Sequence, residues 1–141
     1  MKLPQSARKL LESGAHAHLV TLNADGSPQV SVVWAGVDGD EIVTAHLFPQ
    51  QKLRNIRRDN RVAVSFEGRG QTGIGLMPYL VVYGTATLEL GGAPELLQRL
   101  ARVYLGPNVK FPRMENPPSG TINRIRVERI SGAGPWTGRD A

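Results

Sequence analysis

The sequence contains no cysteine, and this absence excludes three kinds of site at once. A disulfide framework, a thiolate metal centre and a cysteine nucleophile all need a side chain that this chain lacks. Long apolar runs are missing too, because no stretch approaches the roughly 18 residues of a membrane-spanning helix. Residues 1–16 have no apolar core of signal-peptide length. We therefore expect a cytoplasmic protein with no membrane partner.

Acidic and aromatic side chains are scarce. Twelve acidic residues against seventeen Lys and Arg give a net charge of +5, which favours an anionic partner: a nucleic acid or a phosphorylated small molecule. Four aromatic residues are candidates for contact with a planar ligand, with core packing as the equal alternative for each: Trp34, Tyr79, Tyr83 and Trp136. Because base-stacking aromatics on strands are this sparse, we expect no nucleic-acid partner.

Common catalytic signatures are missing as well. There is no Gly-x-Ser-x-Gly elbow, and the glycine-rich run at 68–75 does not open a helix in the dinucleotide-binding manner. His16 and His18 would share one face of a strand, but neither a third ligand nor a supporting partner is visible for them or for His46. We predict no metal site.

The chain that remains is rich in β-forming segments. At 141 residues it fits a single domain, 1–141. Alternating residues and turn sequences predict strands at 16–22, 29–37, 41–46, 61–66, 79–90 and 121–130. Three short helices are expected at 4–13, ending at Gly14, at 50–58, and from Pro94 to Tyr104. The fold class is mainly β: a small barrel of six antiparallel strands and about three helices, with an ordered core at about 5–132 and an irregular C-terminal tail.

The helix at 50–58 carries most of a dense basic cluster. Leu53 and Ile56 mark its buried side, and the basic residues are Lys52, Arg54, Arg57, Arg58 and, beyond the helix, Arg61. A solvated helix face is the plain alternative. Lys52, however, lies in the first turn, where the helix dipole disfavours a cation and free N–H groups suit an anion. A phosphate bound there would satisfy both groups.

Four segments, read in order, carry a family resemblance: "DGSPQVSVVWAGVDGDEIVTA", "QQKLRNIRRDNRVAVSF", "YLVVYGTATLEL" and "RIRVERISG". The chain resembles the split β-barrel superfamily of pyridoxamine 5′-phosphate oxidase-like flavoproteins over roughly residues 5–132. Within it, the sequence is most similar to the branch that uses the deazaflavin coenzyme F420. The resemblance implies a homodimer with the cofactor in a groove at the subunit interface.

The resemblance also implies residue roles. Lys52 matches the lysine that holds the cofactor phosphate, with Gln51 before it and Asn55 after it. An arginine often precedes that lysine in the family, whereas this chain has Gln50 and Gln51, which favours the deazaflavin branch. The ring would contact Gln29, Ser31 and Val33, which share one strand face, and Thr44 on the next strand. Arg57, with Arg58 and Arg61, would attract the oligoglutamate tail, and Tyr79 would shape the acceptor pocket.

The expected function is an F420-dependent oxidoreductase that transfers a hydride to an unsaturated or conjugated small organic acceptor. No catalytic residue is assigned, because the cofactor carries the chemistry. Two alternatives stay open: an FMN-dependent oxidase or reductase on the same barrel, and a non-enzymatic protein that binds a cofactor or haem. In the haem case His16, His18 or His46 would supply the axial ligand.

Overall fold

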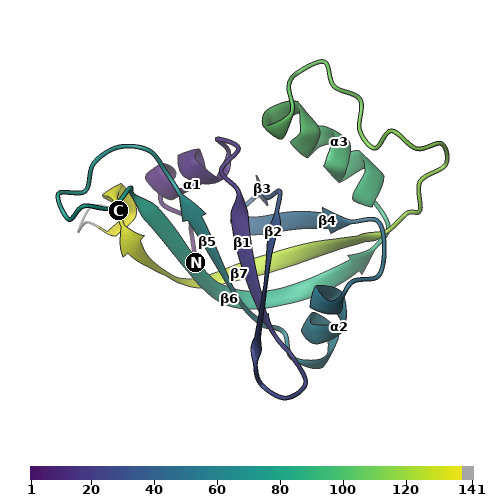
Figure 1. The fold of residues 1–141 in the computed structure, drawn as a ribbon, viewed down its shortest axis with the longest axis horizontal. Helices are drawn as coiled ribbons and strands as arrows, with labels where there is room; N and C mark the ends of the chain where they lie inside the picture. Colours follow the sequence, from purple (N-terminus) through teal and green to yellow (C-terminus); the bar gives the residue numbers. More distant parts are fainter. Residues whose placement is uncertain (138–141) are drawn as a thin grey trace.

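One antiparallel sheet dominates the protein. The computed structural model describes residues 1–137. Its seven strands follow the order β2-β1-β5-β6-β7-β4-β3, and Figure 1 shows the sheet strongly curved but open between its two edges, β2 and β3. The strands are β1 Ala17–Leu22, β2 Pro28–Val33, β3 Gly36–Asp38, β4 Glu41–His46, β5 Arg61–Glu67, β6 Tyr79–Leu90 and β7 Thr121–Ala133. The mainly β, split-barrel class is confirmed.

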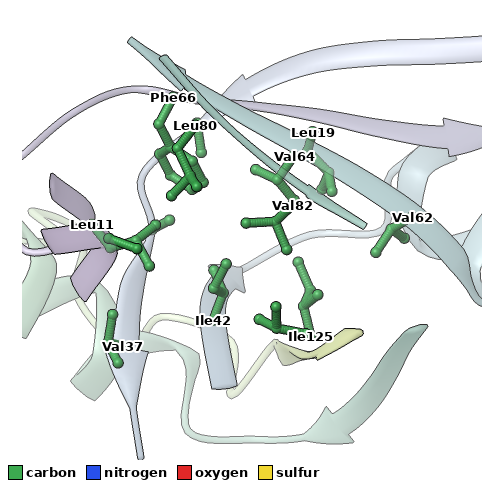
Figure 2. Packing of buried hydrophobic residues seen from close by; sticks show 14 of the residues in the cluster. Leu11, Leu19, Val37, Ile42, Val62, Val64, Phe66, Leu80, Val82 and Ile125 are labelled. Carbon is green, nitrogen blue, oxygen red and sulfur yellow. The ribbon is translucent and has the colours of Figure 1, made fainter. Parts of the chain in front are cut away.

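The inner face of this sheet forms the hydrophobic core. Because side chains alternate along a strand, register decides which residues meet inside. Leu19 pairs with Val64 and Val64 with Val82, and all three are almost fully buried. Figure 2 shows these side chains close to Ile42 and Ile125 from the other half of the sheet. Burying each such side chain stabilises the fold by about 1.5–3 kcal/mol.

The expectation of six strands is wrong, because the predicted strand at 29–37 is two strands. It breaks at Trp34 and Ala35, where the Ala35 N–H donates to the Tyr104 hydroxyl at 3.0 Å instead of to a neighbouring strand. Before the break β2 pairs with β1, and after it β3 pairs with β4. This segment therefore carries the chain across the opening of the barrel.

The ends of the chain also differ from the sequence-based boundaries. The first helix, α1 Gln5–Leu11, ends three residues before Gly14. β7 continues to Ala133, and the short 3-10 helix η1 Pro135–Thr137 follows it. Trp136 is buried there and its indole N–H donates to the Tyr79 carbonyl at 3.0 Å. Ordered structure thus extends past residue 132, while residues 138–141 of the expected tail lie outside the described part.

Two helices lie on opposite sides of β4 (Figure 1). α3 Ala93–Tyr104 packs its Leu96 and Leu100 on Val43, which points out of the barrel. α2 Gln51–Arg58 follows β4 after a short connection and packs on β1 and β6. In the part of the chain that the structure describes, no helix is long and apolar enough to cross a bilayer. α2 is thus held against strands β1 and β6 of the sheet.

A β-bulge bends the long β6–β7 pair. Tyr83 pairs with Arg129 but Gly84 pairs with Val127, so one residue of β7 is left over between them. A Cβ atom on Gly84 would collide with the Arg126 carbonyl oxygen, which is backbone and has little freedom to move.

We predict that Gly84→Ala lowers the free energy of unfolding by about 2–4 kcal/mol, since a bulge that supports the whole sheet must shift. Urea unfolding measures the loss. Thr87→Ala, at an exposed position of the same strand, should cost less than about 1 kcal/mol. Equal losses in the two variants would contradict the assigned close contact.

Candidate functional site

Helix α2 presents a mixed inner face to the barrel. The positions that recur at helical spacing and are buried are Lys52, Leu53, Asn55 and Ile56. Leu53 and Ile56 are 2% and 3% exposed and anchor the helix in the core. The sequence groups Lys52 with the basic residues opposite Leu53 and Ile56, but in the structure Lys52 is buried beside them, and Arg54, Arg57 and Arg58 lie on the solvent side of the helix.

Lys52 is the unusual residue of this face. It is 7% exposed, and no hydrogen bond or ion pair joins its ammonium group to any residue between 1 and 137. Burial lowers the pKa of Lys52 below its ordinary value, because the charged form loses water without gaining a counter-ion. The first turn of α2 has no side-chain cap either, so its first N–H groups have no side-chain acceptor. The ammonium group of Lys52 and the first turn of α2 therefore both lack a side-chain acceptor.

A chain of hydrogen bonds reaches the first turn of α2 from the β1–β2 hairpin. The Thr21 hydroxyl donates to the Gln29 side-chain oxygen at 3.0 Å and accepts from the Asn55 amide at 3.0 Å. The Asn55 oxygen in turn accepts from the Gln51 amide at 2.7 Å. Asn55 is fully buried, and its amide also donates to Asn23. Asn55 therefore fixes α2 against the hairpin, and its predicted contact with a cofactor stays a prediction.

A second chain reaches the same turn from β4. The His46 Nδ1–H donates to the Gln50 side-chain oxygen at 3.1 Å. The Nε2 atom of the neutral ring is then an acceptor, and the Thr44 hydroxyl donates to it at 2.8 Å. Thr44 is fully buried and His46 nearly so. The orientation of the Thr44 hydroxyl is thus set by His46, which in turn is held by the residue that precedes α2.

His46 is neutral at physiological pH. Its pKa is lowered from 6.5 to about 4, first by burial and then by the positive charge of Lys52, while the bond to Gln50 acts weakly in the opposite direction. Lys52 and His46 are therefore close enough to affect each other electrostatically. An anion bound next to Lys52 would offset its positive charge and so raise the pKa of His46 part of the way back.

The other predicted contact residues face the same interior. Thr21 pairs with Gln29, Leu19 with Ser31 and Ala17 with Val33, so the β2 residues lie on the inner side of the sheet. The Ser31 hydroxyl is buried and has no hydrogen-bond partner within residues 1–137. Arg57, in contrast, is exposed on α2. Seven of the eight predicted cofactor residues therefore lie on the inner faces of β2 and β4 or in the first five residues of α2, and Arg57 lies on its outer face.

Two residues of this interior were missed from the sequence. Asn123 on β7 is fully buried, pairs with Thr44 across the strands, and neither side-chain atom of its amide has a partner within the described chain. Gln50 orients His46, as described above. The alternation of Thr121, Asn123 and Ile125 along the strand would have placed Asn123 on the inner face. An amide side chain on an otherwise apolar strand face is unusual, and that signal could have marked Asn123 as a candidate site residue.

Tyr79 is not brought to these residues within one chain. It begins β6 and pairs with Glu67 and Ala133. The Ala86 N–H, seven residues further along β6, bonds the Asn60 carbonyl just after α2, and seven strand residues span about 23 Å. Its assignment to an acceptor pocket stays a prediction.

A separate groove lies on the far side of α3. It has a volume of about 710 Å³ and is bounded by Pro94, Gln98 and Arg102 on the helix and by residues 110–117 of the following loop. None of the predicted cofactor residues lines it. The sequence predicts variable loops at 67–78 and 106–119 as walls of an acceptor pocket, and the second of them does border this groove.

Fold and site together define a split β-barrel with an unneutralised lysine at its polar end. The comparisons agree with this class: residues 3–133 match the family described as pyridoxamine 5′-phosphate oxidase. The chain belongs to this family. Among curated proteins, no sequence matches it.

Solved structures share the whole fold. An F420 reductase is 28% identical, with a TM-score of 0.75, over 92% of this chain and 98% of that one. A FAD-binding protein from Mesorhizobium loti is 22% identical, with a TM-score of 0.64, over 89% of each chain. A haem-binding protein from Mycobacterium smegmatis is 19% identical, with a TM-score of 0.65, over 93% of this chain and 53% of that one. At these identities the last two establish the fold alone, and the family as a whole supports a flavin-type oxidoreductase.

The histidines differ in their availability to a metal. Both ring nitrogens of His46 are engaged, by Thr44 and Gln50. His16 stacks on Tyr104, with the ring centroids 5.8 Å apart, and His18 lies near the Ser65 carbonyl at 3.4 Å. Within residues 1–137, no three His, Asp or Glu side chains form a group that could hold a metal ion. An axial haem ligand would have to come from His16 or His18, or from a rearranged His46.

We predict that the free energy of unfolding falls by about 3 kcal/mol because of His46 alone as the pH decreases from 6.5 to about 4. Between these two pH values His46 is protonated in the unfolded chain but neutral in the folded protein. Lowering the pH therefore favours the unfolded state. Urea titrations at several pH values measure the slope.

His46→Gln keeps a hydrogen-bonding side chain but has no titrating group. Its stability should therefore depend less on pH than that of the wild type between 6.5 and about 4. Parallel pH profiles for the two proteins would show that His46 is not held neutral by the fold.

Proposed function

We propose that this protein is an F420-dependent reductase that binds the phosphate of the deazaflavin coenzyme at the first turn of α2. The observation that carries the proposal is Lys52: a lysine 7% exposed, with no anionic or hydrogen-bonding partner in the described chain, at an uncapped helix N-terminus. An unpaired buried charge is costly, so a site of this kind is explained best by a bound anion. The likeness to an F420 reductase, 28% identical over nearly the whole of both chains, supports the choice of coenzyme.

The inner-facing polar groups fit a ring with hydrogen-bonding edges. Ser31 and Asn123 are buried with unsatisfied side-chain atoms, and a heteroaromatic ring system would supply donors and acceptors for them. Gln29 and Val33 on β2 and Thr44 on β4 would line the same interior, beside the opening of the sheet. When bound, the deazaflavin supplies a hydride, and the role of these residues is to orient the ring and exclude water. The acceptor class proposed is an unsaturated or conjugated small molecule.

The proposed site is completed by a second copy of the chain. The outer face of the edge strand β2 exposes two apolar side chains, Val30 and Val32, which are 60% and 59% exposed. Val30 stands in a row with Val20, Ala63 and Tyr83, and Val32 in a row with His18 and Ser65. Exposed apolar rows of this kind mark interaction surfaces. A homodimer through this face would cover the two valines.

We predict that the purified protein binds F420 and that Lys52→Met weakens the binding by about ten- to a hundredfold, because a charge-assisted hydrogen bond is lost. Quenching of deazaflavin fluorescence measures the affinity. Reduced F420 mixed with a panel of conjugated enones and quinones then tests hydride transfer.

The same Lys52→Met variant should unfold at an equal or higher urea concentration than the wild type, because methionine fills a similar volume without a buried charge. Lys9→Gln removes a charge from an exposed position of α1, away from α2, and serves as the control, with only a small effect on affinity. If neither F420 nor FMN binds the wild-type protein well above micromolar concentration, the proposed function is wrong.

We predict that the wild-type protein sediments as a dimer in analytical ultracentrifugation. Val32→Glu should shift it toward the monomer, because a carboxylate would be buried against an apolar surface. Thr87→Glu, at an exposed position of β6, is the charge-matched control and should leave the dimer intact. A wild-type monomer at micromolar concentration would contradict this part of the proposal.

A further inference from the structure

We propose that the first turn of α2 is matched to a phosphate with one negative charge, a phosphodiester, and selects against the dianion of a phosphomonoester. The inference rests on the proposed function, because it takes this turn as the place where the cofactor phosphate binds. It adds the charge state that the site accepts.

Three of the four arginines of the basic cluster bond to other protein groups, and the fourth, Arg57, is exposed on the outer face of α2. Arg54 donates from Nε and Nη2 to the Gln51 side-chain oxygen at 3.2 and 2.9 Å. Arg58 donates to the Leu22 carbonyl and to Asn55. Arg61 forms an ion pair with Asp59 at 2.7 Å. Among the five basic residues of the cluster and His46, Lys52 alone therefore combines burial with a positive charge that has no partner in the described chain.

The polar side chains that precede Lys52 at the start of α2 are neutral, and the nearest arginine, Arg54, is exposed on the outer face of the helix. Gln50 and Gln51 occupy the cap and the first position of the helix. His46 is uncharged, because its pKa is about 4. With its oxygen bonded to His46, Gln50 keeps an amide N–H₂ as a donor. The site thus offers amide and backbone donors in number but a single buried positive charge.

One anionic charge neutralises this site, and a second is not compensated. In a place where Lys52 is 7% exposed, an extra charge would lose part of its hydration without gaining a partner. A phosphodiester carries one charge at any pH above about 2, whereas a phosphomonoester gains its second charge with a pKa of about 6. The site should therefore bind the two esters differently at high pH and alike at low pH.

Other titrating groups near α2 do not face the same point. The titratable residues on the strands that adjoin the helix are His18 on β1, His46 on β4, and Tyr79, Tyr83 and Glu89 on β6. His18 and Tyr83 belong to the outward rows of the sheet. Tyr79 begins β6 at its far end, and Glu89 is paired with Arg124 at 2.6 Å. The positive charge of Lys52 lowers the pKa of His46.

The test compares FMN with its phosphate monomethyl ester, two ligands with the same ring that differ in one charge. At pH 8 the methyl ester should bind the wild-type protein about tenfold more tightly than FMN, and at pH 5 the two affinities should agree within about threefold. His46→Gln should keep this pH dependence, because the titrating group is on the ligand. Isothermal calorimetry provides a readout independent of turnover.

Gln51→Arg adds a second cation to the site, and at pH 8 it should raise the affinity for FMN about tenfold while changing that for the methyl ester less than threefold. Asn60→Arg adds the same charge beyond the other end of α2 and should change neither affinity beyond about threefold.

Equal affinity of the wild type for FMN and the methyl ester at pH 8 would overturn this inference. If F420 still bound, the proposed function would stand. Failure of F420, FMN and the ester to bind at either pH would overturn both.

Discussion

Lys52 keeps a positive charge inside the protein without an anion of its own, and much of the surrounding structure can be understood from that constraint. A buried ammonium group loses several kcal/mol of hydration, so it persists only where the rest of the fold holds it in place. Leu53 and Ile56 beside it are buried in the core, which fixes the helix and keeps the Lys52 side chain largely out of solvent. The apolar anchors of α2 therefore maintain a site that α2 alone would not favour.

Neutral hydrogen bonds complete this arrangement. From the hairpin, Asn55 ties α2 to Thr21, and from β4, His46 ties Gln50 to Thr44. An amide or a neutral imidazole stabilises the geometry without adding charge, whereas a carboxylate in the same place would pair with Lys52 and remove its attraction for a ligand. The scarcity of acidic residues in the sequence thus extends to this site, where amide and imidazole groups surround Lys52 and the described chain places no carboxylate in contact with it.

Much of this could be predicted from the sequence where a local pattern decides the structure. β6 runs from Tyr79 to Leu90, as its alternation and flanking glycines predict, and α2 begins one residue from its expected start. The break between β2 and β3 could not be predicted, because the hydroxyl that takes the Ala35 N–H comes from Tyr104, 69 residues away. The burial of Lys52 could not be predicted for the same reason. A charged side chain is expected at the surface, and only the tertiary packing of α2 brings this residue inside.

The basic composition points to an anion, but most of the cations serve other purposes. Arg8 pairs with Asp40, and Arg124 bridges Asp38 and Glu89 across the sheet. These exposed pairs are worth little individually and contribute mainly to the long-range field of the molecule. Such a field brings an anionic ligand near the protein without choosing among anions. Discrimination requires groups that are desolvated and fixed, and in this protein those conditions meet at the first turn of α2, where one cation is surrounded by amides.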